Sequence, residues 1–91
     1  MTPSNRSPRP TLPRGVRLRH DAVRERWVLL APERIFEVDA IGVEILKRCD
    51  GRSLDELLSD LAAAFEATPD QIRGDVETFL KGFAEKRVLD L

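Results

Sequence analysis

Two helix-start signatures stand close together in the second half of the chain, and they restrict its fold more than any other feature. Ser53 with Glu56 and Thr68 with Gln71 have the spacing of a capping box, in which each side chain accepts a hydrogen bond from the other residue's backbone N–H group. A proline, which is favoured at the first helical position, follows the second cap. The two signatures predict two consecutive helices joined by a short connection.

Apolar residues recur at helical spacing behind both caps. A third, earlier helix is expected over about residues 40–49, with Asp39 as its N-cap and with Gly51 in the left-handed conformation that ends many helices. The last helix is expected to run to about Lys86. The two stripes are Leu54, Leu57, Leu58, Leu61, Ala62 and Phe65 in the middle helix, and Ile72, Val76, Phe79, Leu80 and Phe83 in the last helix.

The residues before these helices follow the period of two that is typical of strands. Val16 and Leu18 alternate with arginines, "RWVLL" (26–30) is rich in strand-forming residues, and "RIFEV" (34–38) follows a proline that ends the second strand. This order predicts an α+β fold of the winged helix-turn-helix type, with a three-stranded antiparallel sheet followed by a three-helix bundle. The final "RVLDL" is expected to cover the sheet or to extend it.

The first fifteen residues differ in composition from the rest of the chain. They contain four of the six prolines, three arginines and no acid, and such a segment buries too little apolar surface to offset the entropy lost on ordering. We therefore predict a flexible Pro/Arg-rich arm or linker over residues 1–15 and one folded domain over residues 16–91.

Charge and apolar patterning limit the classes of function. Residues 1–36 hold eight arginines and three acids, whereas residues 37–91 hold seven bases and thirteen acids, an asymmetry that bears on the choice of partner. No apolar run exceeds five residues, so the sequence predicts neither a membrane span nor a signal peptide. The single cysteine fits a reducing compartment, and a cytoplasmic protein is expected.

Residues that could carry catalysis are isolated from one another. His20 is the only histidine and Cys49 the only cysteine, so the chain lacks both a pair of metal ligands and a nucleophile beside its base. The carboxylates fall on polar helix faces, and the five glycines are scattered singly, which leaves no phosphate-binding loop. We expect a non-catalytic protein that needs no metal or cofactor.

Two uses of this fold stay open from the residues alone. A winged helix-turn-helix suggests DNA binding, but the three bases of the last predicted helix region, Arg73, Lys81 and Lys86, face four acids, so attraction to phosphate is roughly cancelled. The short third strand, residues 34–38, either closes the sheet over the helices or leaves an edge to which a guest peptide can add as a further strand.

The stretches "WVLLAPERIFEV", "ILKRCDG" and "DVETFL" resemble the PqqD family, and the resemblance extends over residues 16–91. PqqD proteins are peptide chaperones of pyrroloquinoline quinone (PQQ) biosynthesis and prototypes of the recognition element found across ribosomal-peptide pathways. The resemblance implies a non-catalytic domain that binds the precursor peptide PqqA and presents it to the radical S-adenosylmethionine enzyme PqqE, which cross-links a glutamate and a tyrosine of that peptide. A DNA-binding regulator and an adaptor that only holds pathway enzymes together are the alternatives.

The resemblance also implies where the peptide lies, as an added strand against the third strand and beside the third helix. Either Ile35 or Phe36 should point into the core, while Val76 and Leu80 belong to the core stripe as well. Arg34 and Arg73 are the preferred polar contacts. A monomer is expected, although a free sheet edge can also pair with a second copy. The implied site comprises the edge residues Arg34, Ile35, Phe36, Glu37 and Val38 and the helix residues Arg73, Val76, Glu77 and Leu80.

Overall fold

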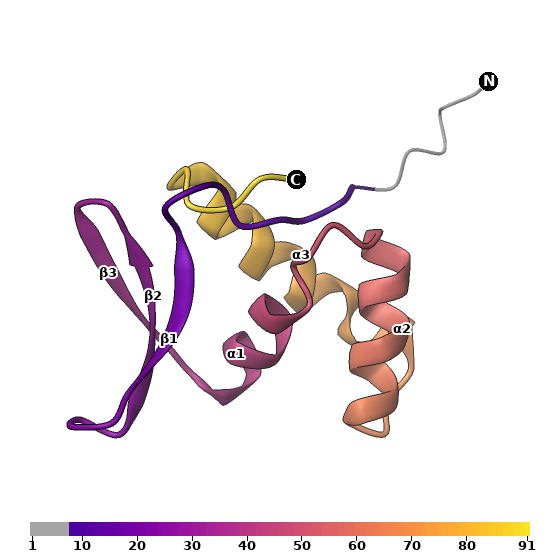
Figure 1. The fold of residues 1–91 in the computed structure, drawn as a ribbon. Coiled ribbons are helices and arrows are strands. Elements are labelled where there is room, and N and C mark those ends of the chain that lie inside the picture. The colour runs from indigo at the N-terminus through magenta and orange to yellow at the C-terminus, as the bar shows by residue number, and fades with distance from the viewer. Residues whose placement is uncertain (1–7) are drawn as a thin grey trace.

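A computed structural model describes residues 8–91, which form three strands and three helices (Figure 1). The expected α+β order, with the sheet first and the helices after it, is confirmed. The elements are β1 (Arg17–Asp21), β2 (Arg26–Ala31), β3 (Arg34–Val38), α1 (Ala40–Lys47), α2 (Leu54–Ala64) and α3 (Pro69–Glu85).

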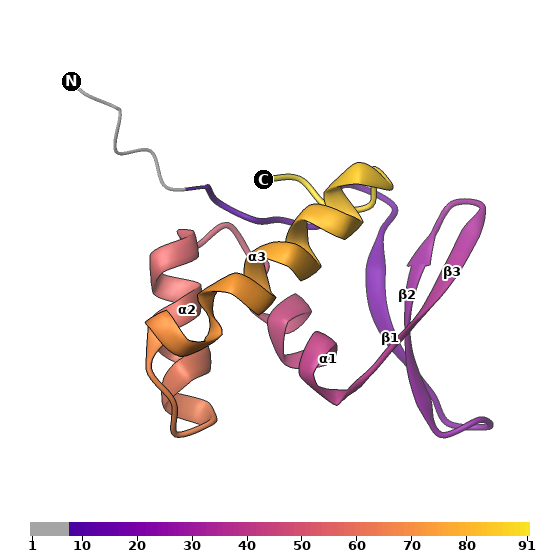
Figure 2. The ribbon, with the colours of Figure 1, turned by 180° about the vertical axis from the view of Figure 1, so that it is seen from behind.

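The sheet is antiparallel in the order β1-β2-β3, so β2 is central and β1 and β3 are its two edges. Its register pairs Leu18 with Leu29 and Leu29 with Phe36, which places these three side chains on one face. That face packs on the helices, and all three helices lie on the same side of the sheet (Figures 1 and 2). The opposite face is left without a covering element among the described residues.

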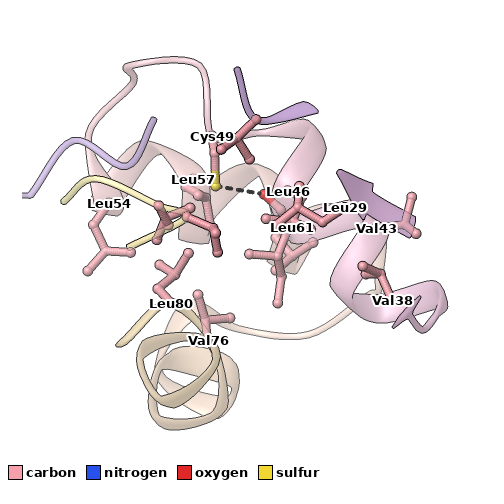
Figure 3. Close-up of a cluster of buried hydrophobic side chains, with 14 of the residues drawn as sticks. Leu29, Val38, Val43, Leu46, Cys49, Leu54, Leu57, Leu61, Val76 and Leu80 are labelled. Atoms are coloured by element: carbon pink, nitrogen blue, oxygen red, sulfur yellow. Dashed lines mark hydrogen bonds between the residues drawn. The ribbon is translucent and has the colours of Figure 1, made fainter. Parts of the chain in front are cut away.

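The core lies where the three helices meet the inner face of the sheet. Leu57, Leu58 and Leu61 of α2 are at most 2% exposed, as are Val76 and Leu80 of α3. Figure 3 shows the last two side chains pointing from α3 into the leucine cluster. Burial of this stripe supplies most of the force that holds the helices together, since burying a leucine or valine side chain contributes about 1.5–3 kcal/mol.

The helix starts agree with the sequence prediction. Ser53 with Glu56 and Thr68 with Gln71 form complete capping boxes, and the Asp39 carboxylate accepts the backbone N–H of Gly42 at 2.7 Å. The end of α1 differs from the prediction.

The helix stops at Lys47 with Arg48 as its C-cap, two residues earlier than expected. Gly51 does adopt the left-handed conformation, with φ +98°, but it does so in the loop that leads to α2. It therefore turns the connection and is not the residue that directly follows the helix cap.

The predicted arm differs from the structure in its second half. Residues 1–7 lie outside the described residues. Pro10 is fully buried and its carbonyl accepts the N–H of Gly51 at 3.2 Å, while Thr11 and Asp90 exchange two backbone hydrogen bonds of 2.9 Å. Residues 8–12 thus run beside the C-terminal segment (Figures 1 and 2), because the tertiary fold supplies partners that composition alone does not reveal.

The C-terminal "RVLDL" was expected to cover or to extend the sheet, and it does not extend it. Val88 and Leu89 are each 2% exposed and join the core cluster. Asp90 pairs with the N-terminal segment through Thr11 and not with a strand of the sheet. The two ends of the described chain consequently brace each other.

Candidate functional site

Strand β3 is an edge strand with one hydrogen-bonded neighbour, β2, among residues 8–91. Its outward backbone groups therefore have no strand partner there, which is the condition for strand addition. Its side chains alternate as expected: Phe36 and Val38 point to the core side, while Ile35 is 68% exposed on the other face. The choice that the sequence left open is settled, since Phe36 is the inward residue and Ile35 the outward one.

Three aromatic rings lie beneath this edge, and we call Phe36, Phe79 and Phe83 the aromatic cluster. The ring centroids of Phe36 and Phe83 are 5.6 Å apart and those of Phe79 and Phe83 are 4.9 Å apart, both in tilted arrangements. All three rings are only partly buried and pack against the core. They offer apolar surface next to the unpaired edge.

Glycine at position 42 lets the aromatic cluster approach α1. A Cβ atom at Gly42 would lie 2.7 Å from Val38 Cγ1 and 2.9 Å from Phe79 Cε1, closer than carbon atoms pack. The last residue of β3 and the ring from α3 therefore meet over this glycine. Exposed Ile41, the neighbouring residue, adds a further apolar side chain at this end of β3.

Arg34 is the first residue of β3, at the end of the strand away from Gly42. Its guanidinium lies 5.3 Å from the centroid of the Phe36 ring and donates a hydrogen bond to the carbonyl of Lys86, the C-cap of α3. A cation at a helix C-terminus interacts favourably with the helix dipole. Arg34 thus ties β3 to α3 and remains exposed, with further N–H groups to offer.

The predicted helix residues do not line this edge. Val76 and Leu80 are each only 2% exposed and point into the core. Arg73 pairs with Asp55 of α2 at 3.5 Å and with Glu77 at 3.7 Å, which places Arg73 and Glu77 on the α2 side of α3. The side of α3 toward β3 carries Phe79 and Phe83 instead.

From the sequence, these two phenylalanines were expected in the core stripe and were not among the expected site residues. Helical spacing predicts a buried stripe, but the two borders of the stripe look alike in sequence. One available signal was chemical. Aromatic side chains at a stripe's border are large enough to be packed on one side and to present a face to a ligand on the other.

The residues with catalytic potential are placed apart from this edge. Burial raises the pKa of the Cys49 thiol to about 12, and its Sγ donates to the carbonyl of Ile45 at 3.4 Å (Figure 3). His20 lies on β1 with its ring centroid 5.1 Å from that of Trp27.

Within residues 8–91 no group of three or more His, Cys, Asp or Glu residues could hold a metal ion. In the same span, none of the helices is long and apolar enough to cross a membrane.

Comparison with known proteins places the chain in one family. The family described as "Coenzyme PQQ synthesis protein D (PqqD)" matches residues 26–89. A "PqqA binding protein" of Xanthomonas euvesicatoria is 45% identical over 92 residues, with complete coverage of both chains. A "Bifunctional coenzyme PQQ synthesis protein C/D" of Methylorubrum extorquens is 48% identical over 82 residues, which are 89% of this chain and 22% of that protein.

Two solved structures share the fold. The solution structure of the PqqD part of Methylobacterium extorquens PqqCD, described as a functional and stand-alone recognition element for ribosomally synthesised and modified peptides, has a TM-score of 0.77 and 46% identity over 90% of this chain and 88% of that one. The crystal structure of PqqD from Xanthomonas campestris has a TM-score of 0.60 and 40% identity over the whole of both chains. The chain belongs to the PqqD family.

Proposed function

We propose that this protein is a non-catalytic peptide chaperone, which binds the precursor peptide PqqA as an added strand on β3 and presents it to PqqE during PQQ biosynthesis. The observation that carries the proposal is the unpaired edge of β3 beside the aromatic cluster. Support comes from the relatives named PqqA binding proteins and from the recognition-element structure that shares the fold.

Different parts of the site would provide affinity for the guest peptide and selectivity among guest sequences. Main-chain hydrogen bonds to residues 34–38 hold any extended guest, whereas alternate guest side chains meet the surface beneath the strand. There the aromatic cluster and Ile41 suit apolar guest residues, and Arg34 suits an acidic one. Arg34 can keep its bond to Lys86 while it binds a carboxylate, because a guanidinium has five N–H donors.

Presentation requires only that the peptide stays accessible while it is bound. A guest on an edge strand has its far side open, so an enzyme can act on residues beyond the bound stretch. We propose that the protein works in the cytoplasm as a monomer that meets PqqE directly, since pairing of two β3 edges would occupy the position of the guest.

A matched pair of charge reversals tests peptide binding. Arg34→Glu places a negative charge at the start of the β3 edge, where the guest would lie, and Arg73→Glu makes the same charge reversal on the α2 side of α3. We expect Arg34→Glu to lower PqqA affinity about tenfold or more, because it would set a carboxylate against an acidic guest residue, and Arg73→Glu to change it little. Equal losses in both variants would contradict a site at β3, and circular dichroism would confirm that each variant is folded.

Presentation to PqqE has a separate test. Size-exclusion chromatography of the protein, PqqA and PqqE should give one ternary complex, and cross-linking of PqqA by PqqE should require the chaperone. A chain that only scaffolds enzymes would be retained by PqqE and would give no signal with PqqA.

A further inference from the structure

The sheet face opposite the helices has an apolar centre. Val28 and Leu30 of β2 and Ile35 of β3 point to this face, because their neighbours Leu29 and Phe36 point to the core. An antiparallel sheet with one open face normally carries polar residues there. Among residues 8–91 no helix or further strand covers this strip, and its exposure is uneven: Ile35 is 68% exposed and Leu30 is half-buried, whereas Val28 is only 8% exposed.

Arginines border the strip on the β1 side. Arg17 lies opposite Leu30 and Arg19 opposite Val28, so the cross-strand neighbours of both cations are apolar. Within residues 8–91 neither arginine has a carboxylate at salt-bridge distance, whereas a third arginine of this face pairs with Glu37. We call this surface the outer face, and its residues are Arg17, Arg19, Asp21, Arg26, Val28, Leu30, Ile35 and Glu37.

The outer face is not flat. Leu30 and Ile35 stand opposite each other in the register and form a ridge across the two strands. A hollow lies on each side of the ridge, one reaching Arg17 and the other reaching Arg19 and Val28. This surface resembles a protein–protein interface, because an apolar centre is bordered by charged residues, here Arg17 and Arg19.

We propose that the outer face docks an acidic patch of the enzyme that receives the peptide, with enzyme carboxylates opposite Arg17 and Arg19. This inference rests on the proposed function: a guest strand beside β3 extends the sheet, so its alternate side chains lie in line with Ile35 and Glu37. An enzyme on the outer face therefore contacts the protein and its bound peptide together. Docking there leaves the aromatic cluster, on the opposite face, to hold the guest.

The same face is poorly suited to nucleic acid. Glu37 and Asp21 lie among the arginines and repel phosphate, and the centre of the surface is apolar. Nucleic-acid interfaces are more polar and more positive than protein interfaces. An acidic protein surface matches both the arginines and the strip, since its carboxylates meet the rim and its apolar groups meet the ridge.

Two double charge reversals of the full-length protein test the proposal. Arg17→Glu with Arg19→Glu alters the outer face, and Lys81→Glu with Arg87→Glu makes the same change in net charge at exposed positions in and after α3. Calorimetry with purified PqqE, without peptide, measures docking. A parallel titration with PqqA measures guest binding, so failure of docking and failure of the proposed function are distinguishable.

We expect the outer-face variant to lose about tenfold or more of its affinity for PqqE while it keeps its affinity for PqqA, with the control variant unchanged in both. Unaltered PqqE binding by the outer-face variant would overturn the proposal, and so would equal weakening in both variants, which is the result for non-specific attraction. Salt-dependent binding of duplex DNA or RNA that is lost only in the outer-face variant, with PqqE affinity unaltered, would assign the face to nucleic acid instead.

Discussion

Substituting Gly42 tests how the site is assembled, because one Cβ atom would enter the contact between β3, α1 and α3. The new methyl would lie 2.7 Å from Val38 Cγ1, 2.9 Å from Phe79 Cε1 and 3.1 Å from Asp39 Oδ1. Overpacking of this kind costs about 1–3 kcal/mol. Alanine's helix propensity returns about 1 kcal/mol, so Gly42→Ala should lower the free energy of unfolding by up to about 2 kcal/mol. Displacement of the Phe79 ring should also weaken PqqA binding.

Gly74→Ala is the matched control. Gly74 lies inside α3, and nothing comes within 4 Å of a Cβ atom built there. The propensity gain then stands alone, and we expect about 0.4–1 kcal/mol of stabilisation. The propensity gain cancels between the two variants, so their difference measures the overpacking at Gly42. Thermal unfolding followed by circular dichroism gives the comparison, since 1 kcal/mol moves the Tm by about 4–8 °C in a domain of this size. Equal stabilisation by both substitutions would refute the packing described for Val38 and Phe79.

Three further predictions concern single groups. Burial raises the pKa of the Cys49 thiol to about 12 from 9.0, so this thiol should react slowly with disulfide reagents at pH 8 in the folded protein. The free energy of unfolding should fall as the pH rises above about 9, because the thiol then ionises in the unfolded state but not in the folded state. Rapid labelling without unfolding would contradict this. The Arg52 guanidinium lowers the pKa of the Asp50 carboxyl to about 2, so Arg52→Ala should return this pKa toward 3.8 in a carboxyl NMR titration. The stability that this pairing contributes to the fold should be present above about pH 4 and lost toward pH 2. An unaltered Asp50 pKa in the variant would contradict the pairing. In urea unfolding, Phe83→Ala should cost about 1–3 kcal/mol, whereas Ile35→Thr should stay within about 0.5 kcal/mol, because Phe83 packs against the core and Ile35 is exposed. Similar losses in both variants would contradict this difference in packing.

The local features of the fold could be predicted because their causes lie within a few residues of chain. Both capping boxes need only a side chain and a backbone N–H group three positions apart, and the bounds of β3 follow from a proline before it and the Asp39 cap after it. Pro10 and Thr11 show the opposite case. Their partners, Gly51 and Asp90, are distant in sequence, so a proline-rich stretch that reads as a linker is held in place by tertiary hydrogen bonds.

The sequence was enough to expect that β3 and α3 are neighbours, but not which residues of α3 face the strand. The resemblance indicated β3 and α3, and both lie side by side in the structure through Phe36 and Phe83. Periodicity alone does not tell which border of the α3 stripe faces the strand. That choice depends on where α2 packs, and the Arg73–Asp55 pair shows that α2 takes the other border.

Strand addition at β3 can be tested by titrating the isotope-labelled full-length protein with synthetic PqqA and following the backbone amide shifts. We predict that the largest shifts fall on residues 34–38 and extend to Phe79 and Phe83, with small shifts at Arg73 and Glu77. Shifts concentrated on β1, the other edge of the sheet, or no shifts at a large excess of peptide, would contradict strand addition at β3.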